Sequence, residues 1–481
     1  MKKLIYILLI AVAFNSCSED DITFTPYNAV NETIVLVTPT DFNNMLTGAY
    51  SYMIKNGGAG GYGEEFLIDS EVLTDNLILK EQGRQSNKTG FEFRYVPSST
   101  HFDYYASAYR PAHISTKILE NINNIPASVD RDNIEGQARF IRALVHFDMV
   151  RIYSKIPSQS ADANASFGMP YLDNSDANWR PVRGTVQETY KKIIDDLLLA
   201  EQKIGTTNLL SQGRASKAAV QGLLSRVYLY MGGAENNAKV IEWGTKAVAG
   251  INVCPRASFV SLWDDGNSNG ILFKLRVDAT DVSIPGVPYS QTLAGGIRSE
   301  YVAPKSVFDL YQTTDIRKAA YFSTSAFSGK IYNHIIKYNG RLTGNANIVD
   351  IKVIRVEEVY LNMAEAQYRI NGGGLSHLDA VRSQRYSPFV SGNETGVALL
   401  NAILLERRLE LAFEMDRFFT LKRLNLTMTR NATEGDFSDG TGTPAIPTAL
   451  TLPAGDIKWQ LPIPQSQIDL NKALQQNPGY N

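Results

Sequence analysis

Three glutamates spaced four residues apart, Glu406, Glu410 and Glu414, are the acidic side chains whose spacing could do chemistry. They lie in the stretch ERRLELAFEMDRFF, and on a helix this spacing puts all three carboxylates on one face. Paired carboxylates can act as acid and base in glycoside hydrolysis. However, arginines interleave with the glutamates, and two hydrolytic carboxylates normally come from separate elements with unequal environments. We therefore interpret the three as members of helix-surface ion pairs, and we predict no catalytic residue.

A glycine-rich stretch, GAGGYG at 58–63, matches the G-x-G-x-x-G pattern of dinucleotide sites. Such a site needs a strand before the pattern and a helix after it, whereas a helical pattern precedes it here. A loop is the better interpretation, and we predict no cofactor. The histidines show no spacing typical of metal ligands, so we predict no metal site, and we interpret His146 as a structural residue within a helix. The histidines are His101, His113, His146, His334 and His377.

Cys17 stands at the end of an apolar leader. Two lysines open the chain, Leu4 to Phe14 is almost wholly apolar, and small residues lead into the cysteine. This pattern is typical of a secretory signal peptide, too short to span a bilayer, and it resembles the lipobox of bacterial lipoproteins. We predict a lipoprotein signal peptide over 1–16 and acylation, such as palmitate, at Cys17. The alternative is an ordinary signal peptide that happens to contain a cysteine.

The segment after the cysteine predicts where the chain is held. Residues 17–38 are interpreted as an acylated tether, and the acidic run at 18–21 resembles the export signal of surface lipoproteins. Each buried acyl methylene contributes about 0.8 kcal/mol, so several chains anchor firmly. We expect the protein to be lipid-anchored in the outer membrane and to face the cell exterior. An acylated Cys17 would leave Cys254 without a disulfide partner.

Composition bounds the class of the remaining chain. Hydrophobic residues make up 44% and charged residues 20%, which is ordinary for a globular protein. The formal net charge is −2 and no basic tract exists, so we predict no nucleic-acid partner. No second apolar run reaches the length of a membrane span. A chain of this length predicts one large domain or two intimately packed halves.

Helical patterns dominate the chain. Apolar residues recur every three to four positions, with Thr185 and Glu188 spaced as a capping box and Gly232-Gly233 as a stop signal. The residue before a proline, Arg110, marks a possible boundary inside the helix predicted within 98–125. We expect the last of these segments to be the longest helix. The predicted helical segments are 38–58, 98–125, 130–153, 185–204, 216–233, 237–250, 355–374, 376–386 and 398–424.

Irregular regions separate the helices. Residues 154–184, 251–350 and 425–464 are rich in Gly, Pro, Asn and Asp and contain only short β-prone pieces. The sequence therefore predicts a mainly α fold: a tetratricopeptide-like scaffold of helix pairs with long loop insertions and a few short strands. We expect a body over 39–481, with an N-terminal helical half at about 39–250 and a loop-rich C-terminal half at about 251–481.

Several stretches together resemble the SusD/RagB family of nutrient-binding outer-membrane lipoproteins. The most specific is the C-terminal WQLPIPQSQIDLNKALQQNPGYN. The stretches ERRLELAFEMDRFFTLKR, VIRVEEVYLNMAEAQYR, ARFIRALVHFDMVRIYSKIP and SKAAVQGLLSRVYLYMG are similar to family helices. The resemblance implies a SusD-like fold, a non-enzymatic binding protein, and a TonB-dependent outer-membrane barrel (SusC-like) over which the protein sits as a lid.

Ligand recognition is expected on the loops. Sugar rings stack on aromatic faces while planar polar groups bond their hydroxyls. The family's tryptophans near 100–110 are missing, so a broad platform for a helical polysaccharide is not expected. We expect an oligosaccharide ligand, with a peptide as the alternative, and a surface glycoside hydrolase or a pure scaffold as further alternatives. The candidate ligand-binding residues are Asp75, Asn76, Arg84, Tyr104, Tyr105, Tyr289, Arg298 and Tyr301.

Overall fold

The computed structural model describes residues 36–54, 61–102, 104–207, 209–278, 286–293, 295–341 and 348–480. Of the glycine run at 58–63, residues 61–63 are described, and Tyr62 and Gly63 begin a short π-helix (Tyr62–Phe66) and not the predicted loop. The signal peptide, Cys17, most of the tether and residues 58–60 lie outside the described residues. The predictions made for them, and the division of the body near residue 250, stay predictions. Within the part of the chain that is described, no helix is both long and apolar enough to cross a bilayer.

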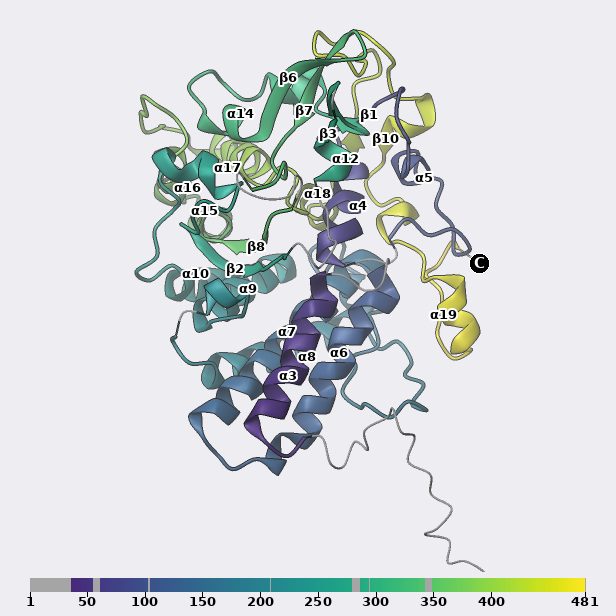
Figure 1. Cartoon of the computed structure of the whole chain (residues 1–481), viewed down its shortest axis with the longest axis vertical. Coiled ribbons are helices and arrows are strands. Elements are labelled where there is room, and N and C mark those ends of the chain that lie inside the picture. The colour runs from purple at the N-terminus through teal and green to yellow at the C-terminus, as the bar shows by residue number, and fades with distance from the viewer. Residues whose placement is uncertain are drawn as a thin grey trace, which may run out of the picture.

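Long helices form the scaffold, and helices that follow one another in sequence pack side by side (Figure 1). The helix α7 packs between α6 and α8, α9 packs on α10, and α15 packs on α10, α16 and α17. These contacts confirm the predicted scaffold of helix pairs. The long helices are α3 (Pro39–Ile54), α6 (Tyr104–Asn121), α7 (Val129–Tyr153), α8 (Val186–Lys203), α9 (Lys217–Met231), α10 (Ala234–Ala247), α15 (Val356–Asn371), α16 (Leu375–Arg382) and α17 (Gly396–Glu410).

Local sequence signals set several helix ends as predicted. At the start of α8, Thr185 Oγ1 accepts a hydrogen bond from Glu188 N at 3.1 Å, and Glu188 Oε2 accepts one from Thr185 N at 2.7 Å. This is the capping box that the sequence predicted. Gly232 ends α9 with a φ of +65°, a conformation that glycine adopts without steric cost. Gly244 lets α10 approach α15 closely, because a Cβ atom there would lie 2.7 Å from Met363 Cγ.

One predicted helix boundary is wrong. The helix α6 runs through Arg110 and contains Pro111 in its interior. Proline removes a backbone donor and disfavours the helical conformation of the residue before it. Buried Ala108, Ala112 and Ser115 pack α6 into the core on both sides of the proline, and α6 contacts both α3 and α7. Tertiary packing therefore overrides the local signal.

The stretch 398–424 is not one long helix. It forms α17 and a separate helix α18 (Arg417–Arg423), whereas the longest helix among the described residues is α7 with 25 residues. Phe413 and Met415 between them have φ values of +67° and +65°. The carbonyls freed at this break are bonded by side chains, since Lys337 Nζ donates to Ala412 O at 2.7 Å and Tyr338 Oη to Phe413 O at 2.8 Å. These buried donors stabilise a break that the helical periodicity does not reveal.

Short elements fill the predicted irregular regions, although FVSLW at 259–263 contains a helical turn and not the expected β-prone piece. A four-stranded antiparallel sheet has the order β1-β5-β7-β6, and β2-β8, β3-β4 and β9-β10 form two-stranded antiparallel pairs. The strands are β1 (Ile78–Leu79), β2 (Ile271–Leu275), β3 (Gln291–Leu293), β4 (Gly296–Arg298), β5 (Tyr301–Val302), β6 (Phe322–Phe327), β7 (Lys330–Ile335), β8 (Ile351–Arg355), β9 (Met428–Thr429) and β10 (Thr451–Leu452). The short helices are α4 (Leu67–Val72), α5 (Lys88–Phe91), α11 (Phe259–Leu262), α12 (Val287–Ser290), α13 (Lys305–Phe308), α14 (Ile316–Tyr321) and α19 (Gln465–Leu470).

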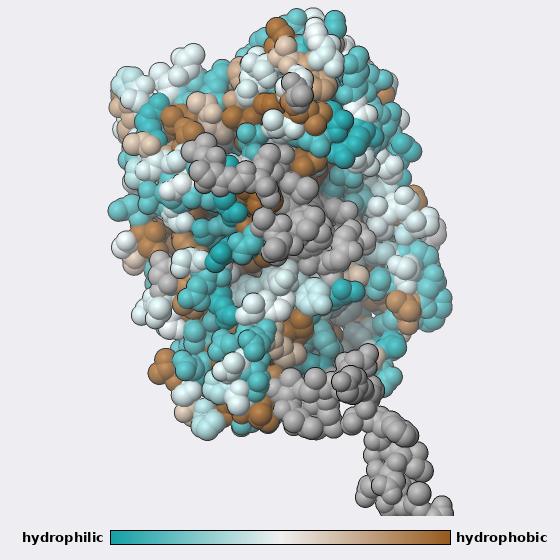
Figure 2. Space-filling model, in the orientation of Figure 1, coloured by the Kyte–Doolittle hydropathy of each residue, from teal (hydrophilic) through white to brown (hydrophobic). Residues whose placement is uncertain are grey.

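The surface in the view of Figure 2 mixes polar and apolar residues, with apolar residues gathered above the central grey atoms. Apolar residues make up a large part of the surface of every folded protein, so this pattern alone does not mark a ligand site. A hollow lined by polar groups is the more specific mark of a ligand site.

Candidate functional site

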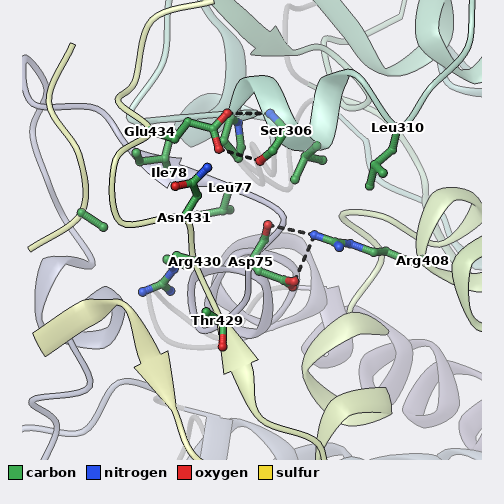
Figure 3. A pocket seen from close by; sticks show the side chains of 13 residues that line it. Asp75, Leu77, Ile78, Ser306, Leu310, Arg408, Thr429, Arg430, Asn431 and Glu434 are labelled. Carbon is green, nitrogen blue, oxygen red and sulfur yellow. Dashed lines mark hydrogen bonds and ion pairs between the residues drawn. The ribbon is translucent and has the colours of Figure 1, made fainter. Parts of the chain in front are cut away.

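A cavity of about 370 Å³ lies where four segments far apart in the sequence meet (Figure 3). The loop after α4 forms one side, α13 a second, Arg408 of α17 a third, and β9 with the loop that follows it a fourth. The lining residues are Asp75, Leu77, Ile78, Pro304, Ser306, Val307, Leu310, Arg408, Thr429, Arg430, Asn431, Glu434 and Ala445. We refer to this cavity as the Asp75 pocket.

Asp75 is held between two arginines. Its Oδ1 accepts from Arg417 Nε at 2.8 Å, and its Oδ2 lies 2.8 Å from Arg417 Nη2 and 3.1 Å from Arg408 Nη2. Burial alone would raise the pKa of Asp75, but Arg408 and Arg417 outweigh it and lower the pKa to about 2. Asp75 is therefore a fixed anion at neutral pH, and its main effect is to orient Arg408.

Arg408 carries the donor that a ligand could use. Its Nε donates to Asn76 Oδ1 at 2.9 Å and its Nη2 to Asp75 O at 3.0 Å. Nη1 has no hydrogen-bond partner within the described parts of the chain, and Arg408 lines the pocket. A guanidinium held at one edge and open at the other is a preorganised donor for a hydroxyl, carbonyl or carboxylate.

Arg430 holds the opposite side of the pocket in place. Its side chain donates to four backbone carbonyls, Thr74 O at 2.9 Å, Phe91 O at 2.8 Å, Val72 O at 2.6 Å and Ala449 O at 2.5 Å. Burial lowers the pKa of Arg430 to about 9, so the side chain remains a cation at neutral pH. These bonds tie the loop after β9 to the end of α4. The neighbouring Thr429 and Asn431 are exposed as a result.

Glu434 closes the rim above α13. Its Oε1 accepts from Ser306 N and its Oε2 from Ser306 Oγ, both at 2.6 Å. A carboxylate that accepts from the first turn of a helix satisfies donors that would otherwise have no partner. The pocket thus combines apolar and polar lining residues, and no aromatic ring is among them. It can bind a polar molecule through hydrogen bonds, but it cannot stack a sugar ring.

The four predicted tyrosines lie in the core, which corrects their predicted stacking role. Tyr104, Tyr105, Tyr289 and Tyr301 are between 0% and 5% exposed. Tyr104 packs on Phe66 with ring centroids 4.6 Å apart, and Tyr289 stacks near Tyr338 at 6.3 Å. The sequence predicts these tyrosines on loops, whereas they lie in α6, α12 and β5, and their rings pack these elements into the core.

The remaining predicted residues separate into three environments. Asp75 lines the pocket, and Asn76 lies buried behind it, where its Nδ2 donates to Glu71 Oε2 at 3.1 Å. Arg84 is exposed away from the pocket lining and pairs with Glu300 at 2.6 Å. Arg298, in β4, bonds Gln291 of β3. The structure therefore brings only Asp75 of the predicted set into the pocket, with Asn76 behind it.

Sequence reasoning missed most of the pocket. Thr429, Arg430, Asn431 and Glu434 stand in a region read only as irregular, where no periodic pattern marks a site. Arg408 stands among the arginines of ERRLELAFEMDRFF, for which the sequence predicts helix-surface ion pairs and not a ligand contact. The one available signal was a cluster of polar residues on a long loop, which is weak by itself.

The three glutamates form ion pairs as predicted, but the pairs are buried and do not lie on a helix surface. Glu410 bonds Arg385 Nε at 2.8 Å and Arg355 Nη1 at 2.9 Å, and all three side chains are inaccessible. Burial would raise the pKa of Glu410, but the arginines outweigh it and lower the pKa far below its ordinary range. Glu406 and Glu414 are likewise paired, and Glu414 stands beyond the end of α17. Such carboxylates lie in a closed charge network and not beside a substrate.

His146 is structural, as predicted. Its Nδ1 lies 2.7 Å from Arg142 O, and its Nε2 accepts from Leu172 N at 2.9 Å. Cys254 is a buried free thiol. Within the described ranges, no group of three His, Cys, Asp or Glu side chains is placed to hold a metal ion.

A helix-pair scaffold that presents a polar pocket between long loops defines a class of binding proteins. A family model described as starch-binding associating with outer membrane matches residues 25–229, and a model of the SusD family matches residues 261–480. The chain belongs to the SusD/RagB family.

Individual relatives agree with this assignment. The SusD-like protein P2 of Formosa agariphila is 22% identical, over 88% of this chain and 90% of the relative. A SusD superfamily protein of Bacteroides vulgatus has a similar structure, with a TM-score of 0.79 and 24% identity over 92% of this chain and 99% of the other. A SusD-like carbohydrate binding protein of the same species gives a TM-score of 0.78 and 21% identity over 91% and 97%. At this identity the structural likeness establishes the fold.

Proposed function

We propose that this protein binds an oligosaccharide at the cell surface and delivers it to a TonB-dependent outer-membrane barrel of the SusC type. The observation that carries the proposal is the Asp75 pocket, a hollow whose lining includes the polar side chains of Arg408, Thr429 and Asn431. Family membership supports the ligand class, because the model matching residues 25–229 is described as starch-binding and associating with outer membrane.

The proposed attachment is through lipid at Cys17, with residues 17–38 as a tether. A tether anchored in the same membrane as a partner keeps the binding body near that partner and so raises its effective concentration. The pocket lies between loops while the helix pairs form a rigid scaffold, which suits a lid that closes over a transporter.

A peptide is the second candidate ligand. It is favoured by the lack of an aromatic ring among the pocket's lining residues and by a guanidinium that can bond a carbonyl or a carboxylate. The double variant Thr429→Val with Asn431→Ala tests both candidates, because both residues are exposed and no hydrogen bond within the described chain depends on the Thr429 side chain. Each lost neutral hydrogen bond is worth about 0.5–1.5 kcal/mol, so affinity should fall about 10-fold.

The assay is calorimetric titration with panels of oligosaccharides and tryptic peptides. Asn393→Ala, on another exposed loop, is the matched control and should bind as the unmodified protein does. If a peptide binds the unmodified protein and binds the double variant more weakly, the ligand is a peptide and not an oligosaccharide. Equal affinity of the double variant and the control would refute the pocket as the site.

Delivery and lack of catalysis have separate tests. Detergent-solubilised membranes captured through a C-terminal tag should yield a large barrel in near-equal amount. Delivery to a barrel would be refuted if the protein is captured without a barrel and if deletion of its gene leaves growth on every glycan and peptide unchanged. The purified mature chain should leave bound oligosaccharide intact over a long incubation, and turnover of the oligosaccharide would show an enzyme instead.

A further inference from the structure

A second hollow, of about 470 Å³, lies between α8 and the loop that precedes it. It shares no lining residue with the Asp75 pocket. We call it the Trp179 cleft, after the one tryptophan in its wall. The lining residues are Met169, Tyr171, Trp179, Arg180, Pro181, Val182, Gly184, Glu188, Thr189 and Lys192.

Trp179 differs from the other tryptophans of the chain. Trp243, Trp263 and Trp459 are 8%, 4% and 1% exposed, whereas Trp179 is partly exposed at the wall of the cleft. An indole is the largest flat apolar side chain, and proteins normally bury it or use it for contacts. Val182, 54% exposed, extends the apolar surface of the same loop.

The loop that carries Trp179 is held at both ends. Before Trp179, Leu172 N donates to His146 Nε2 at 2.9 Å. After it, Asn471 Nδ2 donates to Pro181 O at 2.8 Å. Arg183 Nη1 bonds Asn477 Oδ1 at 2.8 Å, which fixes the end of the loop to the C-terminal segment. A wall held in this way pays little conformational entropy when a ligand binds.

Charged groups border the indole. Lys192 Nζ lies 2.6 Å from Asp173 Oδ2 and 5.7 Å from the centre of the Tyr171 ring. The Glu188 carboxylate stays ionised at neutral pH because hydrogen bonds from Thr185 lower its pKa. Arg180 is exposed beside Trp179, and two backbone carbonyls accept from its Nη1. A flat apolar face bordered by planar and charged hydrogen-bonding groups is the combination that a sugar ring requires.

We infer that the Trp179 cleft is a second carbohydrate-binding site, in which one sugar ring of a polysaccharide stacks on Trp179 and its hydroxyls bond Arg180, Glu188 and Lys192. A polysaccharide fits better than a peptide, because the cleft is bordered by a helix and a loop and offers no strand edge with which a peptide could pair. The inference shares its ligand class with the proposed function but uses none of the same residues. Two sites on one chain would hold a long polysaccharide more strongly than either site alone.

The experiment combines electrophoresis in gels that contain dextran, xylan, laminarin, inulin or pectin with acrylamide quenching of tryptophan fluorescence. A glycan bound in the cleft should protect Trp179, the most accessible indole, from acrylamide. Trp179→Ala should weaken retardation by that glycan about 3- to 10-fold, since one stacking contact is worth about 0.5–1.5 kcal/mol. Trp179→Phe, which keeps an aromatic ring, should retain part of the retardation.

Tyr52→Ala is the matched control, because Tyr52 is an aromatic residue 38% exposed on α3, outside the cleft. It should bind as the unmodified protein does. Failure of every glycan to protect Trp179, or full retardation of Trp179→Ala, would overturn the inference, whether or not the Asp75 pocket binds an oligosaccharide. The two sites are separate if the Thr429→Val, Asn431→Ala variant loses oligosaccharide binding while the glycan still protects its Trp179 from acrylamide.

Discussion

Replacing Glu71 with glutamine should stabilise the protein at neutral pH. Glu71 lies at the end of α4, fully buried, and its Oε2 accepts from Asn76 Nδ2 at 3.1 Å. Its Oε1 has no hydrogen-bond partner within the described residues. Burial raises the pKa of Glu71 from 4.5 to about 7, and the bond from Asn76 opposes the rise without cancelling it.

The sign of the pH effect follows from proton binding. Between pH 4.5 and about 7 the folded protein holds a proton on Glu71 that the unfolded chain has released, so stability falls as the pH rises through this window. The pKa difference of about 2.5, at 1.36 kcal/mol for each pKa unit, corresponds to a cost of ~3 kcal/mol above pH 7. Glu71→Gln carries no charge and removes this cost.

The assay is urea unfolding of both proteins between pH 4.5 and pH 8. The free energy of unfolding of the variant minus that of the unmodified protein should grow with pH across the window and then level off. Glu81→Gln, an exposed glutamate, is the control and should follow the unmodified protein at every pH. A constant difference between pH 5 and pH 7.5 would refute the argument, because a buried acid of raised pKa must produce a slope.

Three further predictions rest on single residues. Cys17→Ala should release the protein from the outer membrane; a variant that still pellets with membranes and is cleaved by protease on intact cells would refute the lipid anchor. Glu410→Gln should lower the free energy of unfolding by about 3–5 kcal/mol, because it breaks a buried ion pair with Arg385. Urea unfolding should show that the difference between the two proteins shrinks below pH 4.5, because the lowered pKa of Glu410 gives the unmodified protein stability that is lost as the pH falls. Lys422→Met should cost about 3 kcal/mol by the same measurement, because Lys422 Nζ donates to backbone carbonyls at the end of α7, whereas the exposed Lys472→Met should change little.

The helical scaffold was predictable because it depends on local signals. Apolar periodicity, the Thr185 capping box and the Gly232 stop act within a few residues, so the sequence contains them directly. The errors arose where distant groups override local preference. Pro111 lies inside α6 because packing supports the helix around it, and α17 ends early because Lys337 and Tyr338 bond the carbonyls at the break.

The pocket was less predictable, because its walls come from segments far apart in the chain. Asp75 could be proposed from its place after a helix, but its pairing with Arg408 and Arg417 crosses more than three hundred positions. The predicted stacking role of the tyrosines was wrong for a related reason. A tyrosine in an irregular region can face solvent or hold the loop to the core, and only the packing around Tyr289 and Tyr301 shows the second case.

Several of the sequence stretches that resemble the family hold distant segments of the fold together, although one of them also supplies Arg408 to the Asp75 pocket. In the helix α15, Glu358 pairs with Arg226 and Glu365 with Arg423, each at 2.6 Å. In the C-terminal stretch, Asn477 Nδ2 donates to Tyr153 O at the end of α7 at 2.7 Å. A buried charge or amide that loses its partner destabilises the fold, so neither residue of such a pair can be replaced alone without a loss of stability. Recognition of the family therefore rests largely on residues that hold segments together, whereas Thr429 and Asn431 of the proposed ligand site lie outside the stretches that resemble the family.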